Sequence, residues 1–208
     1  MKNGFARFWR RPPAALAAQR WVVLDVETSG LDASRDALIA IGAVAMRGGR
    51  VIPGDSLELV IRQTEASSRE NILVHRVGRA AQLGGTEPAA AALALVDFIG
   101  RAPLLAFHAP FDRGFLARAV KAHLKRRLDN PWLDLAELAP VLEPKARLCS
   151  LDDWLAFYSI PAASRHNAAG DAFATALLAA RLIPEARRQG AKSFAELQAL
   201  ARAGKWVQ

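Results

Sequence analysis

Two carboxylate residues end an apolar run near the start of the chain. The stretch WVVLDVETSGLD covers residues 21–32, and it sets Asp25 and Glu27 two positions apart. Residues two positions apart in a strand point to the same face, so these carboxylates are expected to lie side by side. A proton, a basic partner or a divalent cation would relieve their repulsion. A solvated strand end explains this pair, taken alone, equally well.

A third acid follows a second apolar run. The stretch LLAFHAPFDRGFLARAV, residues 104–120, passes from a short buried strand through a proline-containing turn to Asp112 at the start of a helix. Capping and the helix dipole both favour an acid at that position. Asp112 considered alone is therefore a good helix-start residue and nothing more.

A fourth acid and a histidine open a late helix. In RHNAAGDAFATALLAARL, residues 165–182, Asn167 can cap the helix and Asp171 follows within about one turn. Asp171 lies near the stripe that we assign to the core, where a lone acid is costly. That stripe comprises Phe173, Leu177, Leu178 and Leu182. His166, five residues before Asp171, would by itself be a surface or capping histidine.

The spacing of apolar and turn-forming residues predicts a mixed-sheet α/β domain. Three strands joined by short turns predict an antiparallel meander, and Pro53-Gly54 marks a bulge or an edge in the third strand. These strands are expected at residues 21–26, 37–46 and 51–61. Later short strands alternate with helices, which is typical of a sheet with helices on its faces.

The remaining elements follow from the same patterns. A buried strand is expected at residues 103–107, and a strand-to-helix segment at 133–142. Residues 62–87 are polar and are expected to be irregular. Pro184 is expected to end the fourth helix. Helices are expected at residues 88–99, 112–128, 150–158, 167–183 and 193–203.

The order of the acidic motifs resembles the DEDDh family of 3′–5′ exonucleases. That family includes the polymerase III epsilon subunit, RNase T and oligoribonuclease. DVETSGLD is close to the family's first motif, Asp-x-Glu-Thr-Thr-Gly-Leu-Asp, and ILVHRVG at 72–78 resembles its Ile-x-x-x-His-Gly-Ile segment. APFDRGFL at 109–116 and RHNAAGDA at 165–172 follow the second and third motifs. A histidine five positions before the last aspartate indicates the h branch.

The resemblance covers about residues 20–183 and implies a fold and a chemistry. The implied fold is RNase H-like, a mixed five-stranded sheet with a three-stranded antiparallel meander and parallel strands, flanked by helices. One exonuclease domain is expected over residues 21–208, after a basic extension at 1–20. Asp25, Glu27, Asp112 and Asp171 would hold two Mg²⁺ or Mn²⁺ ions, since hard cations take oxygen ligands. His166 would be the general base that activates water, releasing nucleoside 5′-monophosphates from the 3′ ends of DNA or RNA.

The family also implies substrate contacts. Leu31 would wedge against the last base, and Thr28 would hydrogen-bond near the 3′ end; turn packing is the equally weighted alternative for both. His75 and His108 are further expected substrate-binding residues. The usual His-Asn before the second motif is replaced by Phe107 and His108, which leaves the substrate preference open. Asp134 matches another acid of the family and is expected to give structural support, without binding metal.

The charge balance favours a polyanionic partner. The formal net charge is +8, and a basic protein of this kind attracts nucleic acid or an anionic surface. One basic stretch without an acid comprises Arg113, Arg118, Lys121, Lys125, Arg126 and Arg127. A solvated helix face explains any one of these side chains slightly better, and a solvated arm is likewise favoured for residues 1–20. Expected partners are single-stranded 3′ ends, and a polymerase or a second copy of the chain.

Cysteine usage and hydropathy indicate the compartment. Cys149 is the single cysteine, so no internal disulfide can form, which suits a reducing cytoplasm. We expect Cys149 to be a buried spectator. The sequence shows no signal peptide and no apolar run near the length of a membrane span, so no membrane association is expected.

Two rival functions remain open. A catalytically idle nucleic-acid-binding adaptor on the same fold would tolerate loss of a ligand, yet all four acids and His166 are present. A metal phosphohydrolase acting on mononucleotides would not need an extended basic track. Comparing hydrolysis of a mononucleotide ester with that of an oligomer separates this second rival from an exonuclease.

Overall fold

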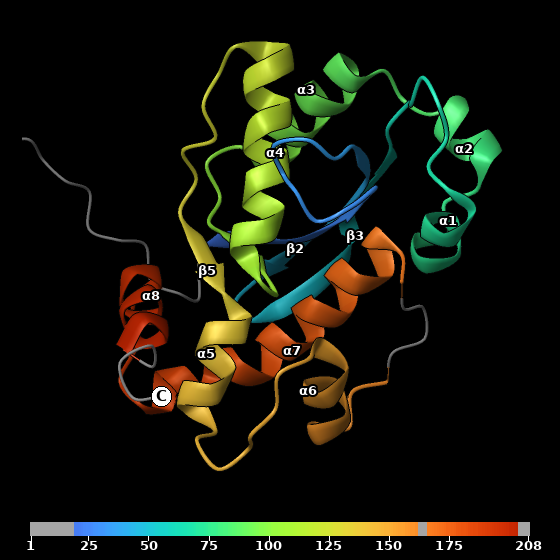
Figure 1. The fold of residues 1–208 in the computed structure, drawn as a ribbon. Helices are drawn as coiled ribbons and strands as arrows, with labels where there is room; N and C mark the ends of the chain where they lie inside the picture. Colours follow the sequence, from blue (N-terminus) through green and yellow to red (C-terminus); the bar gives the residue numbers. More distant parts are fainter. Residues whose placement is uncertain (1–18, 162–165, 204–208) are drawn as a thin grey trace, which may run out of the picture.

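A five-stranded sheet forms the centre of the molecule. The computed structural model describes residues 19–161 and 166–203 (Figure 1), so residues 1–18 of the predicted basic extension lie outside the described residues. Arg20, predicted in that extension, instead begins the first strand and pairs with Asp55. The strand order is β3-β2-β1-β4-β5. The strands are β1 (Arg20–Thr28), β2 (Leu38–Arg47), β3 (Arg50–Val60), β4 (Leu104–Ala106) and β5 (Trp132–Asp134).

Strand pairing confirms the predicted meander. β1 pairs antiparallel with β2, and β2 pairs antiparallel with β3, while β1–β4 and β4–β5 are parallel. The register of β2 and β3 jumps from Val44 opposite Ser56 to Ala45 opposite Ile52. The predicted bulge therefore lies at Pro53-Gly54, where proline could not donate to the ladder.

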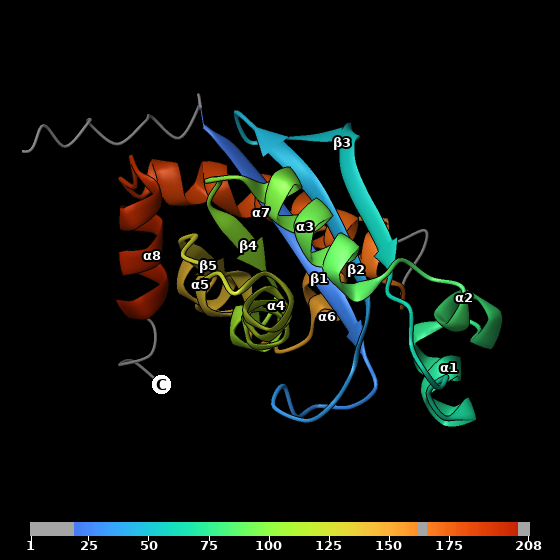
Figure 2. The same cartoon turned by 90° about the horizontal axis from the view of Figure 1, so that it is seen from above.

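Helices cover both faces of the sheet. α3 and α4 lie on one face, and α7 lies across the other, with α5, α6 and α8 packed beside it (Figure 2). α1 and α2 stand together at one end of the molecule (Figures 1 and 2). The helices are α1 (Arg69–His75), α2 (Arg79–Leu83), α3 (Pro88–Ile99), α4 (Ala109–Leu124), α5 (Leu135–Leu142), α6 (Leu151–Phe157), α7 (Ala168–Arg188) and α8 (Phe194–Ala203).

The alternation along β1 assigns each side chain to a layer. Val22 and Leu24 belong to the apolar cluster under α3 and α4, whereas Trp21 and Val23 belong to the cluster around α7. Because the strand period is two, Asp25 continues the series that faces α7. The first residues of β1 therefore pack in the core, and near the end of the same strand Asp25 places its carboxylate on the face that α7 covers.

Residues 62–87 differ from the expectation of irregular structure. They contain α1 and α2, each only a turn or two long. The side chain of Ser68 accepts a hydrogen bond from the amide of Asn71 (3.2 Å) and so caps α1. This local capping signal outweighs the polar composition of the segment.

Three expectations for the second half of the chain were wrong. α7 continues through Pro184 to Arg188, because the neighbouring Ile183 and Ala186 are both buried and hold the helix against the core. Phe173 was assigned to the core stripe but is 37% exposed. Cys149 is exposed, since it lies in the non-helical connection between α5 and α6 and not in a packed element.

The structure contains no membrane-spanning helix among residues 19–161 and 166–203: none combines the required length with a sufficiently apolar composition.

A buried polar network holds α1 and α2 together. His75 is 1% exposed. Its Nδ1 accepts a hydrogen bond from the amide of Val77 (2.9 Å), so Nε2 carries the proton and donates to Ser67 Oγ (3.0 Å). The buried Gln82 side chain donates to Ser67 Oγ and to the carbonyl of Val77. This geometry requires a neutral imidazole, because a protonated Nδ1 would face another donor.

We expect the stability of the protein to fall as pH drops below about 6.5, the ordinary histidine pKa. Burial lowers the pKa of His75 in the folded state. Its stabilising contribution is therefore present above the unfolded pKa and is lost as pH falls through the lower folded pKa. Urea denaturation at stepped pH measures this loss, and His75→Gln should flatten the pH dependence. An equally steep dependence in that variant would contradict the assignment.

Candidate active site

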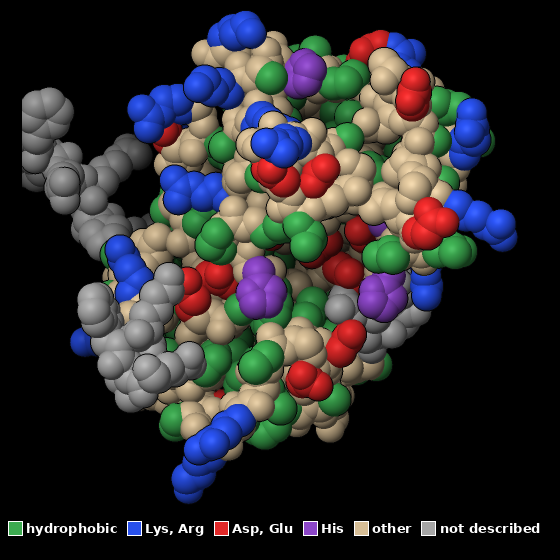
Figure 3. Space-filling view, in the orientation of Figure 1, with side chains coloured by type: hydrophobic (Ala, Val, Ile, Leu, Met, Phe, Trp, Pro, Cys, Tyr) green, Lys and Arg blue, Asp and Glu red, His purple; other side chains and the backbone are tan. Residues whose placement is uncertain are grey.

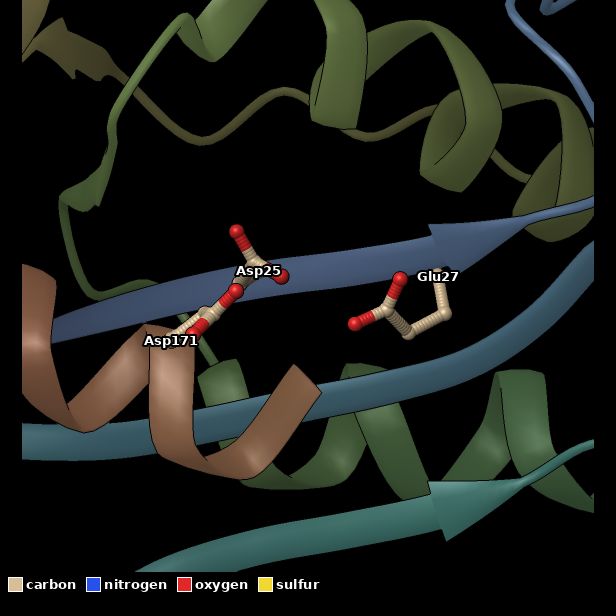
Figure 4. A group of neighbouring side chains, drawn as sticks. All are labelled: Asp25, Glu27 and Asp171. Atoms are coloured by element: carbon tan, nitrogen blue, oxygen red, sulfur yellow. The ribbon is translucent and has the colours of Figure 1, made fainter. Parts of the chain in front are cut away.

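Three carboxylates converge between β1 and the start of α7. Asp25 and Glu27 come from β1 and Asp171 from α7, and one oxygen of each lies within 4.8 Å of the others. Asp25 and Asp171 point toward each other, and the carboxylate of Glu27 turns back toward the pair (Figure 4). Three of the four acids expected to bind metal therefore lie close together in the structure.

Gly42 lets α7 approach the sheet closely enough to complete this group. Gly42 pairs with Asp25 across β1 and β2. A Cβ atom on Gly42 would lie 2.1 Å from the carbonyl carbon and oxygen of Ala168, the first residue of α7. Only glycine leaves room for that backbone. Gly42 is not among the site residues predicted from the sequence, although a glycine within the apolar strand LIAIGAVAM is itself a signal of close backbone approach.

Gly42→Ala is expected to lower exonuclease activity by about 10²-fold, because a displacement of about 1 Å at a catalytic group has an effect of that size. The added methyl group must push the first turn of α7, and with it Asp171, away from Asp25. Steady-state hydrolysis of a single-stranded oligonucleotide measures the change. Gly54→Ala is the matched control, because a Cβ there meets no atom within 4 Å. Equal activity of the two variants would rule out this role for Gly42.

Asp112 lies beside the three-acid group and is buried. It is 2% exposed in the first turn of α4, which begins three residues earlier than predicted. Burial raises the pKa of the Asp112 carboxyl well above its usual range, backbone hydrogen bonds including one from Val26 oppose this, and the charges of Asp134 and Glu27 add to it. The bond to Val26 attaches Asp112 to β1 between the two acids of that strand. Asp112 is not a member of the group within 4.8 Å.

His166 lies at the entrance to the site. Its backbone amide donates to Oδ1 of Asp171 (3.2 Å), and its side chain is exposed. Its φ of 63° is in the left-handed region, which few residues other than glycine, asparagine and aspartate adopt easily. Asn167 follows as the cap of α7, accepting from the amide of Gly170 (2.8 Å). The cap and the Asp171 contact together fix the main chain at His166.

Asp134 supports the β4–α4 turn, as predicted. Its Oδ1 accepts from the amides of Ala136 (2.9 Å) and His108 (3.0 Å), which joins the start of α5 to the start of α4. His108 adopts a left-handed conformation with φ 65° and is exposed. The ring of Phe107 is buried and lies edge-on to His108, 4.8 Å between centroids. Oδ1 of Asp134 is therefore committed to the backbone, while the His108 imidazole is left at the surface.

Thr28 at the end of β1 and Leu31 in the loop that follows have different surroundings. The hydroxyl of Thr28 donates to the carbonyl of Gly30 (2.7 Å), and the carbonyl of Thr28 accepts from the Asn71 side chain (3.3 Å). Thr28 thus stabilises the turn and the junction with α1. Leu31 is 87% exposed and has no packing role. His75, expected to bind substrate, is enclosed in the α1–α2 network with both ring nitrogens in use, so it supports this region from within.

The acidic group lies in a hollow on one face of the molecule. Figure 3 shows acidic side chains gathered in this hollow, with a histidine side chain on either side. Lys and Arg side chains gather over the α4 side of the same face. Negative charge is therefore concentrated where a cation could bind, within a surface whose rim is positive.

A comparison with known protein families assigns the chain. The sequence model of the RNase_T exonuclease family matches residues 22–179. The chain belongs to this exonuclease family. The match begins within β1 and ends within α7, so it contains all four acids and His166.

Relatives of the exonuclease domain occur among DNA polymerase III proteins. The PolC-type DNA polymerase III of Latilactobacillus sakei is 32% identical over 178 residues, covering 82% of this chain and 12% of the relative. The DNA polymerase III subunit epsilon-like protein of Rhodobacter capsulatus is 32% identical over 179 residues, covering 84% of this chain and 25% of the relative. The chain thus spans a quarter or less of the length of these two relatives.

Solved exonuclease structures share the fold. Escherichia coli exonuclease I in complex with a dT13 oligonucleotide has a TM-score of 0.70 at 16% identity, covering 82% of this chain and 42% of that chain. Exonuclease I from Methylocaldum szegediense has a TM-score of 0.68 at 16% identity, covering 83% and 41%. The predicted RNase H-like fold and the resemblance to the DEDDh exonucleases are confirmed.

Proposed function

We propose that this exonuclease domain removes nucleotides one at a time from the 3′ ends of single-stranded DNA or RNA and releases nucleoside 5′-monophosphates. The observation that carries the proposal is the convergence of Asp25, Glu27 and Asp171, with Asp112 attached to the same strand and His166 at the entrance. A chain of this family with its acids dispersed would fit the idle adaptor instead.

The residues present fit a site for Mg²⁺ or Mn²⁺. The donors are carboxylate oxygens, which hard cations prefer, and three of them lie within 4.8 Å of one another. The fourth, Asp112, is a buried acid that needs a compensating positive charge to ionise. Asp25, Glu27, Asp112 and Asp171 would hold two ions. When bound, such a pair stabilises the attacking and leaving oxygens of an in-line displacement at phosphorus.

The side chains around the acids have separate tasks in this proposal. His166 takes a proton from the attacking water, because its imidazole is exposed while its main chain is fixed by Asp171. Leu31, exposed beyond the end of β1, packs against the last base. His108 lies at the surface at the start of α4, where its side chain can contact the nucleic-acid strand. Thr28 and His75 hold the loop and α1 in place.

A single-stranded substrate suits this arrangement. Leu31 can reach the terminal base only if that base is unpaired, and the positive rim attracts phosphates without regard to sequence. Escherichia coli exonuclease I, which shares the fold, has been solved with single-stranded DNA. The epsilon-like and PolC-type relatives favour a polymerase as a partner of this chain.

A digest of labelled polymers tests the proposal. DNA and RNA labelled at the 5′ end are incubated with the purified protein in Mg²⁺, in Mn²⁺ and in chelator. A ladder that shortens from the 3′ end and requires metal is the expected result, and the faster polymer identifies the substrate. Binding without a ladder would indicate the adaptor. Hydrolysis of a mononucleotide ester with no action on oligomers would indicate the phosphohydrolase.

A further inference from the structure

A groove lies between α4 and α8, next to the proposed catalytic site. Its volume is about 510 Å³. It begins at Ala109 and Pro110, in the same first turn of α4 that carries Asp112, and it reaches Ala201 and Arg202 at the end of α8. β5 and the start of α5 form its floor. Ala109 follows His108 directly. A nucleic-acid strand that leaves the acidic hollow past His108 would therefore enter this groove.

The groove offers a surface on which a base can stack. Trp132, at the start of β5, lines it, and the residue is partly exposed. The Nε1 atom of Trp132 is buried without a hydrogen-bond partner among the described residues. Aromatic side chains of this kind stack with any base, because every base has a π-face. Glu137 and Asp134 also line the groove, and Asp134 is committed to the backbone amides described above.

Two arginines at the rim can contact phosphates. Arg113 is exposed on α4 and makes no ion pair within the described part of the chain. Arg202 is held over the groove by a chain of contacts. The Gln198 side chain donates to the carbonyl of Trp132 (2.7 Å), and Nε of Arg202 donates to the carbonyl of Gln198 (3.1 Å). Lys121, two turns beyond Arg113 on the same side of α4, extends the positive rim.

We infer that the α4–α8 groove binds an unpaired nucleotide of the substrate strand upstream of its 3′ end, with the base against Trp132 and flanking phosphates at Arg113 and Arg202. This inference rests on the proposed function, because it names where the rest of the substrate lies. An aromatic face, two guanidinium groups and polar side chains within one groove match the chemistry of a nucleotide.

Chain-length dependence of hydrolysis tests the groove. The substrates are p-nitrophenyl thymidine 5′-monophosphate, a dinucleotide and a dodecanucleotide, all single-stranded. Wild type is compared with Arg113→Ala/Arg202→Ala and with Trp132→Leu, which keeps apolar bulk but removes the stacking face. Arg50→Ala/Arg187→Ala removes the same charge from exposed positions outside the groove and is the matched control.

We expect the arginine double variant to raise KM for the dodecanucleotide by about tenfold. Its kcat, and its hydrolysis of the small ester and the dinucleotide, should match those of wild type. The Arg50→Ala/Arg187→Ala control should still hydrolyse the dodecanucleotide more efficiently than the small substrates, as wild type does. Equal KM values for wild type and the groove variants on the long substrate would overturn the inference, as would an equal loss in the control.

Binding separates this inference from the proposed function. The affinity for a fluorescent dodecanucleotide is measured in chelator, where no hydrolysis takes place. If wild type cleaves nothing but binds the oligonucleotide about tenfold more tightly than the groove variants, nucleotide binding in the groove is supported and the exonuclease proposal fails. If wild type cleaves oligonucleotides and the groove variants bind equally well, the groove inference fails alone. Loss of binding to a protein partner only, with oligonucleotide affinity intact, would also overturn it.

Discussion

Asp25→Asn is expected to lower kcat/KM on a single-stranded oligonucleotide by at least about 10³-fold, because loss of charge stabilisation by metal removes several kcal/mol. The same change should raise the melting temperature of the metal-free protein. Asp25, Glu27 and Asp171 crowd three carboxylates within 4.8 Å, and an amide in place of one of them relieves the repulsion. Activity and stability should therefore move in opposite directions.

Added Mg²⁺ provides the second half of this test. Wild type should gain thermal stability with Mg²⁺ concentration, since a ligand that binds the folded state stabilises it, and the variant should gain much less. Asp97→Asn, at an exposed position on α3, is the control and should behave as wild type in both assays. A fall in both activity and metal-free stability would mean that Asp25 serves the fold and not a metal.

His166→Asn is expected to lower kcat by roughly 10²–10⁴-fold, the usual contribution of a general base. Asparagine is the suitable replacement because it tolerates the left-handed conformation of His166. The main-chain contact with Asp171 does not depend on the side chain, so the stabilisation by Mg²⁺ should persist. This result differs from that of Asp25→Asn, which should lose both.

Chemical rescue makes the assignment of His166 specific. In His166→Gly, glycine adopts the same φ without strain, and it leaves space that free imidazole can fill. Added imidazole should restore part of the activity of this variant and none of that of Asp25→Asn. His123→Asn, at an exposed position in the last turn of α4, should keep full activity. Absence of rescue together with a normal rate in His166→Asn would remove the residue from the mechanism.

Local periodicity explains what the sequence could predict. The strand period put Asp25 and Glu27 on one face, and the structure agrees because a two-residue period depends only on neighbouring residues. The helix-start pattern likewise placed Asp171 in the first turn of α7. Spacing and motif order are sufficient to predict these residues, because neither depends on the contact between β1 and α7.

Contacts between distant segments account for what the sequence analysis missed. Gly42 matters only because Ala168 lies against it, and no local pattern specifies that partner. His75 matches a family motif but is buried in a hydrogen-bond network with Ser67 and Gln82. The polar composition of residues 62–87 predicts irregular structure there and gives no sign of this network. Burial depends on what packs above a residue, so motif position alone did not distinguish a supporting histidine from an exposed one.

The chain order of the acidic group has a consequence for biosynthesis. Within the domain, Asp25 and Glu27 are synthesised near the start, whereas Asp171 is added after most of the domain has been made. A nascent chain that ends before His166 has the central strand of the sheet but lacks both His166 and the last acid. Under the proposed function the site therefore becomes complete only when the first turn of α7 has been made.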